Sequence, residues 1–256
     1  MVPLSVLETE GFDLEAVMVS GLLPPHFLSP DPVEDLRAYV ADYLKEEIAA
    51  EALTRNIPAF AEFLKVASLT SGALLNYVNV ARETGVSHKV VRTYFDILED
   101  TYLGFRVPSW KKSRKRRLIE TEKFYLFDVG VMTYLSRQAP RIGSPGFGTA
   151  FEHYILMELR AFQAYTAPDL EITYWRTAGG FEVDFILGDK ELALEVKGSK
   201  RTHKGDERGL RALKEDGPVK HAVIVSLEET PRRLDSGIEV VPWRMFIDRL
   251  WGRDFL

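Results

Sequence analysis

The sequence predicts an α+β or mixed α/β protein of two parts, a helical region followed by a helix-covered sheet. Apolar residues recur at helical spacing through the first third, whereas short segments with strand alternation dominate the second half. Between them, residues 138–148 are rich in glycine, proline and other turn formers. A chain of 256 residues is long enough for two ordinary domains, which we expect at 1–140 and 141–256.

Composition excludes several classes of protein. Hydrophobic residues make up 46% and charged residues 28%, values that are typical of a globular protein. The first 15 residues are acidic and no apolar run reaches the ~18 residues of a membrane span, so we expect a cytoplasmic protein without membrane contact. There is no cysteine and the five histidines are scattered, so a metal would be a hard ion held by carboxylates.

The charge is unevenly distributed along the chain. Residues 1–84 carry 5 basic and 13 acidic side chains, residues 85–120 carry 9 and 4, and residues 121–256 carry 19 and 21. A basic block in an acidic protein is a candidate phosphate-binding surface, although it can also be a solvated loop.

The helical elements are predicted in order. Asp31 and Pro32 begin a helix whose apolar residues recur from Val33 to Ile48, and Pro58 begins a second with Phe60, Phe63, Leu64 and Ala67 on its apolar side. Residues 75–84 form a short periodic segment that ends at Gly85. Ser87 caps the next helix, which buries Val90, Val91, Tyr94, Phe95 and Leu98.

These last two helices, joined by a short glycine-containing turn, are typical of a helix-turn-helix, and the alternative is an ordinary helical hairpin. His88, Lys89 and Arg92 would face outward from the second helix. Strands at 102–107 and 118–127 follow, and the loop between them carries six cations, Lys111, Lys112, Arg114, Lys115, Arg116 and Arg117. This pattern favours a winged helix-turn-helix at about 57–127 that contacts DNA phosphates, although winged helices also bind proteins.

The second part reads as helix 149–165, strands 171–176, 181–187 and 191–197, helix 206–214, strands 220–226 and 237–241, and a helix from Pro242. Asp128 caps a short helix, 129–137, before the boundary. The order is therefore αβββαβ with a closing strand and helix.

The hairpin at 181–197 places acidic residues together. For Val183, Phe185 and Leu187 to share a core face with the apolar residues of the next strand, Asp184, Glu195, Lys197 and Glu182 must lie on the opposite face. A turn centred on Asp189 and Lys190 puts Asp184 opposite Glu195, and one centred on Gly188 and Asp189 puts them on a diagonal.

Carboxylates packed side by side repel each other, and a bound Mg²⁺ or Mn²⁺ would offset that repulsion and activate water. Lys197 would orient the water or stabilise the charged transition state. The alternative is that Lys197 only pairs with Glu182 and Glu195 on a solvated face. Glu152, on the first turn of its helix, would either reach the metal or close a capping box with Thr149.

In this order and context, Glu152, Asp184 and Glu195-Val-Lys197 resemble the PD-(D/E)xK nuclease-like superfamily, whose core is αβββαβ. Nearly the whole chain is also similar to the uncharacterised C-terminal region of prokaryotic AAA-type ATPases. That similarity is carried by residues 87–105, Lys123–Val129, Phe151-Glu-His-Tyr, the segments from Tyr174 to Leu187 and from Leu194 to Lys197, and Ile238-Glu-Val-Val-Pro-Trp.

The resemblance implies a winged helix followed by a restriction-endonuclease-like domain, with Asp184 and Glu195 as metal ligands, Lys197 as the catalytic lysine and Glu152 as the helix acid. Family members usually begin with a nucleotide-binding module, yet no G-x-x-x-x-G-K-[ST] loop is present. We therefore expect no bound nucleotide and no ATP hydrolysis by this chain, and an ATPase module would be a separate partner or a missing part.

The function that these features favour is a Mg²⁺-dependent DNA endonuclease with a winged-helix DNA-binding domain. A second hypothesis is a non-catalytic DNA-binding or regulatory module of an AAA-type ATPase, in which the acidic cluster is a relic. A third is a protein-interaction adaptor.

Overall fold

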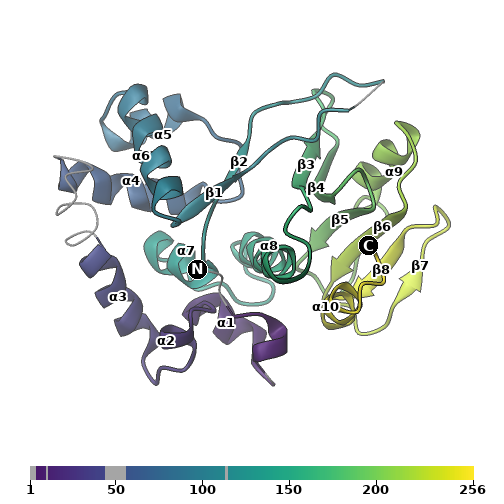
Figure 1. Cartoon of the computed structure of the whole chain (residues 1–256), viewed down its shortest axis with the longest axis horizontal. Coiled ribbons are helices and arrows are strands. Elements are labelled where there is room, and N and C mark those ends of the chain that lie inside the picture. Colours follow the sequence, from purple (N-terminus) through teal and green to yellow (C-terminus); the bar gives the residue numbers. More distant parts are fainter. Residues whose placement is uncertain (1–3, 10, 44–55, 113–114) are drawn as a thin grey trace. The chain divides into compact units, whose positions relative to one another are not determined.

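A computed structural model describes residues 4–9, 11–43, 56–112 and 115–256. It has two compact units. The first comprises Met1–Arg106 and Lys123–Arg141, and the second comprises Val107–Glu122 and Ile142–Leu256. The first is mainly helical and the second is built on a sheet, which confirms the predicted α+β class (Figure 1).

The described part of the first unit consists of short helices and a two-stranded sheet. Its elements are η1 (Val6–Glu8), α1 (Leu14–Ser20), α2 (Pro24–Phe27), α3 (Pro32–Tyr43), α4 (Ile57–Leu69), α5 (Tyr77–Thr84), α6 (His88–Asp100), β1 (Gly104–Val107), β2 (Lys123–Leu126) and α7 (Val129–Ser136).

The two helices of the segment around Gly85 form where the sequence predicts them. Asn76 caps α5, Gly85 ends it in the left-handed conformation, and the Ser87 side chain accepts a hydrogen bond from the Val90 amide at the start of α6. The aromatic residues of the predicted apolar stripes pack together, with Phe63 in edge contact with Phe95. Val90 was wrongly assigned to the buried stripe: it lies in the first turn of α6 and is 37% exposed.

The helix predicted to begin at Pro32 differs from the expectation at one residue and is only partly described. Val33 is exposed because it lies in the first turn of α3, whereas Leu36 of the same stripe is fully buried. The predicted continuation of this helix to Ile48 falls in residues 44–55, which the structure does not describe.

A buried carboxylate ties the beginning of the first unit to its end. Asp128 caps α7 by accepting a hydrogen bond from the Val131 amide, and its other oxygen accepts one from the Leu22 amide at 2.9 Å. Burial raises the pKa of Asp128 to about 6, against the lowering effect of these amides. A Cβ at Gly130 would lie 2.3 Å from the Gly21 nitrogen, so the two segments meet only because both residues are glycine.

The second unit contains α8 (Phe147–Thr166), β3 (Ile172–Arg176), β4 (Glu182–Leu187), β5 (Leu192–Lys197), α9 (Arg208–Glu215), β6 (His221–Ser226), β7 (Arg232–Arg233), β8 (Glu239–Pro242) and α10 (Trp243–Trp251). The strands form one six-stranded sheet in the order β3-β4-β5-β6-β8-β7. β3, β4 and β5 are antiparallel neighbours, whereas β5, β6 and β8 run parallel. Sequence patterning missed only the two-residue edge strand β7 among these strands.

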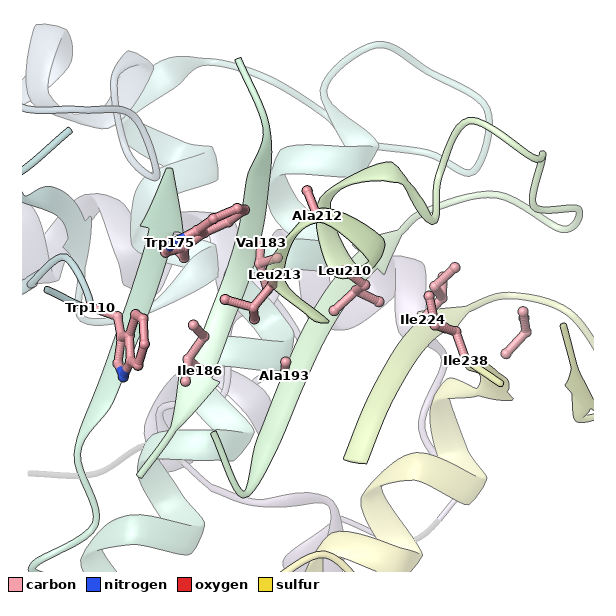
Figure 2. Packing of buried hydrophobic residues seen from close by; sticks show 11 residues of the cluster. Trp110, Trp175, Val183, Ile186, Ala193, Leu210, Ala212, Leu213, Ile224 and Ile238 are labelled. Carbon is pink, nitrogen blue, oxygen red and sulfur yellow. The ribbon is translucent and has the colours of Figure 1, made fainter. Parts of the chain in front are cut away.

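Both faces of the central strands are buried. On one face, α9 packs its Leu210 and Leu213 onto Ile186, Ala193 and Ile224 (Figure 2). α8 contacts β5, and α10 contacts β6, β8 and α8. The residues of β5 that point to either face are therefore buried, except Lys197, which is half-buried. The alternative of a solvated sheet face does not hold for Glu195, which is buried because helices cover the sheet on both sides.

The segment that carries the basic block belongs to the second unit, and we call Val107–Glu122 the edge segment. The predicted strand 118–127 is confined to Lys123–Leu126. The residues before it extend along β3 instead: the Trp110 amide donates to the Tyr174 carbonyl at 2.7 Å, and the Ile119 amide donates to the Arg176 carbonyl at 2.9 Å. Trp110 is 6% exposed and belongs to the same core cluster as Trp175, which Figure 2 shows.

Among the described residues, none of the helices combines the length and the apolar character that a membrane span requires.

The packing of Trp110 predicts that the edge segment stabilises the second unit. We expect Trp110→Ala to lower the free energy of unfolding by ~3–5 kcal/mol, because it leaves a cavity in the hydrophobic core that Trp110 shares with Trp175. Urea denaturation followed by far-UV circular dichroism measures this change. Leu28→Ala, at a position that is 76% exposed, is the control and should change stability by less than ~0.5 kcal/mol. If the edge segment only projected into solvent, both variants would have nearly the stability of the wild type, which would contradict this prediction.

Candidate active site

The candidate site lies where β4 and β5 separate. Their backbone pairs run from Leu187↔Leu192 to Phe185↔Leu194, which is the register of the turn centred on Asp189 and Lys190. On the other side, β4 pairs with β3 at Ile186↔Thr173 and next at Val183↔Trp175, so β4 advances three residues while β3 advances two. β4 therefore contains a β-bulge at Asp184 and Phe185.

The bulge changes the predicted alternation. Val183 was expected to share a face with Phe185 and Leu187, but it packs in the cluster of Ile186 and Ala193. The extra residue turns Asp184 toward β5, where its Oδ2 accepts a hydrogen bond from the Val196 amide at 2.8 Å. The Asp184 side chain thus takes the place of a backbone carbonyl as the acceptor for β5, just beyond the last backbone pair, Phe185↔Leu194. This is the usual effect of a bulge, which redirects one side chain.

Three side chains converge at this point: Asp184, Glu195 and Lys197. Lys197 Nζ donates a hydrogen bond to Glu195 Oε1 at 2.6 Å. Asp184 is 7% exposed and Glu195 9%, whereas the Lys197 side chain is 31% exposed. The cluster is therefore largely buried and reaches the surface mainly through Lys197.

Glu195 is the electrostatically unusual member of the cluster. Its Oε2 atom is buried and has no hydrogen-bond partner among the residues that the structure describes. Burial raises the pKa of Glu195 to about 7, against the lowering effect of Lys197, and the negative charges of Glu152 and Glu182 raise it further. A buried carboxylate with an unsatisfied oxygen is costly for the fold, which points to a role in binding a cation or moving a proton.

Lys197 remains protonated at neutral pH. Burial alone would lower its pKa, but the charges of Glu195 and Asp184 outweigh burial, so the pKa of Lys197 is raised. The charge of Asp206, in the loop between β5 and α9, contributes in the same direction. Lys197 is therefore a hydrogen-bond donor and a positive charge, not a general base.

Glu152 lies on α8, but not where a capping box requires it. The helix begins at Phe147, with Gly146 as its N-cap, so Thr149 is already inside the helix. The predicted capping box is thus wrong. The start of α8 is close to the end of β5, because a Cβ at Gly198 would lie 2.9 Å from Phe147 Cδ1. Glu152 is half-buried and its charge acts on Glu195.

The residues fit a divalent cation only through two carboxylates. In the part of the chain that the structure describes, no three His, Asp or Glu side chains come together as a metal-binding group. Mg²⁺ is commonly held in proteins by one or two carboxylates, with waters and substrate phosphates as its other ligands. Asp184 and the open Oε2 of Glu195 meet that requirement, and Glu152 does not complete a third ligand.

The residues predicted to contact nucleic acid fall in two places. His88, Lys89 and Arg92 are exposed on α6, where the Arg92 guanidinium lies 5.1 Å from the Tyr77 ring centre. The cations of the basic block lie in the second unit, except Arg114, which is outside the described residues. Several of these are held by carboxyl groups: Lys112 pairs with Asp189 at 3.1 Å and Arg116 with Glu215 at 2.7 Å.

Sequence reasoning missed a group at the start of β4. The guanidinium groups of Arg116 and Arg208 lie 5.3 and 5.8 Å from the centre of the Phe181 ring. Gly209 makes this possible, because a Cβ there would lie 1.7 Å from the Glu182 carbonyl oxygen. A glycine in the first turn of an amphipathic helix was the only signal for this close contact.

Comparison with known proteins finds two family models that match different parts of the chain. Residues 11–141 match the family model "Domain of unknown function (DUF8612)", which spans just over half of the chain, and the protein belongs to this family. Residues 147–246 match a second model, "Domain of unknown function (DUF4143)", a C-terminal domain typical of AAA-ATPase-associated proteins. Neither curated proteins nor solved structures include a match.

The raised pKa of Glu195 predicts how stability depends on pH. Folded Glu195 holds its proton up to about pH 7, whereas the unfolded chain releases it near 4.5, so stability should fall as pH rises through that window. Glu195→Gln should flatten this dependence. Urea unfolding at about pH 5 and pH 8 measures it, with the exposed Glu229→Gln as control. Equal pH dependence in all three proteins would show that Glu195 does not hold its proton in the fold.

Proposed function

We propose that the second unit hydrolyses phosphodiester bonds of DNA with the aid of Mg²⁺ or Mn²⁺. The observation that carries this proposal is the buried Glu195 Oε2, which has no hydrogen-bond partner and lies beside Lys197 in the cluster with Asp184. A cation bound there would offset the cost of burying two carboxylates on adjacent strands.

Each residue has a distinct role in the proposal. Asp184 and Glu195 would hold the ion, which when bound supplies a polarised phosphoryl oxygen and an activated water. Asp184 is fixed for this task by the Val196 amide. Lys197 donates hydrogen bonds to phosphoryl oxygens and stabilises the negative charge of the transition state. Glu152 acts on the site through the field that it exerts on Glu195.

The first unit would dock on DNA through α6. Supporting this role, α4, α5 and α6 are followed by the β1-β2 pair, and Leu74 forms an additional bridge to Lys123. This is the element order of a winged helix. α6 begins with His88 and Lys89, and the first residues of a recognition helix are those that reach base edges and phosphates.

Cleavage of plasmid DNA tests the nuclease proposal. We expect nicking or linearisation with Mg²⁺ or Mn²⁺, and a loss of at least ~10²-fold in rate for Asp184→Asn and for Lys197→Met, because each removes a group that stabilises the transition state. Gel electrophoresis of the products measures the rates.

The exposed Asp169→Asn in the same unit is the control and should retain full activity. Thermal unfolding shows that each variant is folded. If pure protein leaves linear, circular and branched DNA intact in both metals, the nuclease proposal is rejected.

The second candidate is a non-catalytic DNA-binding or regulatory module of an AAA-type ATPase. It is favoured by the match to a family model typical of AAA-ATPase-associated proteins, together with the absence of a P-loop from this chain. It expects salt-dependent DNA binding without any cleavage product, and binding that Asp184→Asn leaves unchanged.

A further inference from the structure

The edge segment gives the second unit a positively charged border. It is fastened along β3, since the Trp110 amide donates to the Tyr174 carbonyl at 2.7 Å and the Ile119 amide to the Arg176 carbonyl at 2.9 Å; beyond β3, the Ala178 amide donates to the Arg117 carbonyl at 2.9 Å. Near its middle, the Lys115 amide donates to Asp216 Oδ1 at 2.9 Å and Lys115 Nζ donates to the Glu215 carbonyl at 2.7 Å. These bonds hold Lys115 and the backbone of the described part of the edge segment in place on this unit.

The border leads to the candidate site. Arg116 and Arg208 lie against Phe181, which directly precedes β4, the strand that carries Asp184. Phe181 precedes Asp184 by three residues, a distance of ~10 Å at ~3.3 Å per strand residue, and a duplex backbone rises ~3.4 Å per nucleotide. A backbone held at the border would thus reach the acidic cluster within about three nucleotides.

The charges of this region suit a polyanion such as a nucleic acid backbone. The basic side chains would bind its phosphates, and the acidic cluster would bind one phosphate through a metal ion. Lys111, Lys112, Lys115 and Arg117 are exposed, whereas the carboxylates of the cluster are buried. We propose that the edge segment, though inserted between the strands of the first unit, is the phosphate-binding border of the second unit and grips the DNA backbone beside the Asp184–Glu195–Lys197 cluster. This inference rests on the proposed function for its substrate.

DNA binding by the full chain tests the border without cleavage. Fluorescence anisotropy of a labelled duplex in EDTA, over a salt series, compares the wild type with Lys111→Gln/Lys112→Gln/Arg117→Gln. Each phosphate contact contributes ~0.9 to the slope of log K against log salt, so the slope should fall by about 2 to 3. The control Arg37→Gln/Lys65→Gln/Arg233→Gln removes the same charge from exposed positions on α3, α4 and β7 and should leave the slope unchanged.

Cross-linking locates the contact. The chain has no cysteine, so Lys112→Cys carries its only thiol, to which a photoreactive group can be attached. We expect this label to cross-link the duplex, and the same label on Lys65→Cys to do so at least tenfold less. An unchanged salt slope in the triple variant, or equal cross-linking from the two positions, would overturn the proposed border.

The two proposals fail separately. If the border variant weakens binding but no DNA is ever cleaved, the nuclease is rejected and the phosphate-binding border stands. If DNA is cleaved in a manner that depends on Lys197 while the border variant binds as the wild type does, the border is rejected and the nuclease stands.

Discussion

The structure of the second unit depends on the cost of burying charge between β4 and β5. Helices cover both faces of the sheet, so Asp184, Glu195 and Lys197 leave water together when the chain folds. Lys197 satisfies one oxygen of Glu195 and the Val196 amide satisfies one of Asp184, but Glu195 Oε2 stays without a partner. Apolar residues of similar size would cost less, so stability alone does not explain this arrangement. The proposed cation would bind the open oxygen and offset this cost.

The edge segment shows why order along the chain is a poor guide to which unit a residue serves. The chain leaves the first unit after Arg106, runs along β3 and returns at Lys123. The edge segment stays with the second unit because Trp110 fills part of its hydrophobic core. The backbone around Trp110 also pairs with β3 at the edge of the sheet. Covering a sheet edge with another segment also prevents unwanted pairing with other chains. Because the basic block lies in the same segment, this packing places it on the second unit.

Much of the fold could be predicted from local patterns. Helical periodicity located α4 to α6, and the capping residues Ser87 and Asp128 correctly located the starts of α6 and α7. Strand alternation located β3 to β6. The errors arose where tertiary contacts override local pattern. Thr149 is a good capping residue, yet α8 begins earlier, at Phe147, which packs beside Gly198. The strand predicted at 118–127 is shortened because Ile119 pairs with Arg176 of β3 instead.

The sequence by itself determined the division into a helical and a sheet region and the residue types of the candidate site, because each depends on composition or on spacing along one element. Only the tertiary structure decided that the acidic residues are buried, that a bulge turns Asp184 toward β5, and that the basic block lies on the second unit. Those features arise from contacts between segments distant in the chain, and periodicity within one segment carries no information about them.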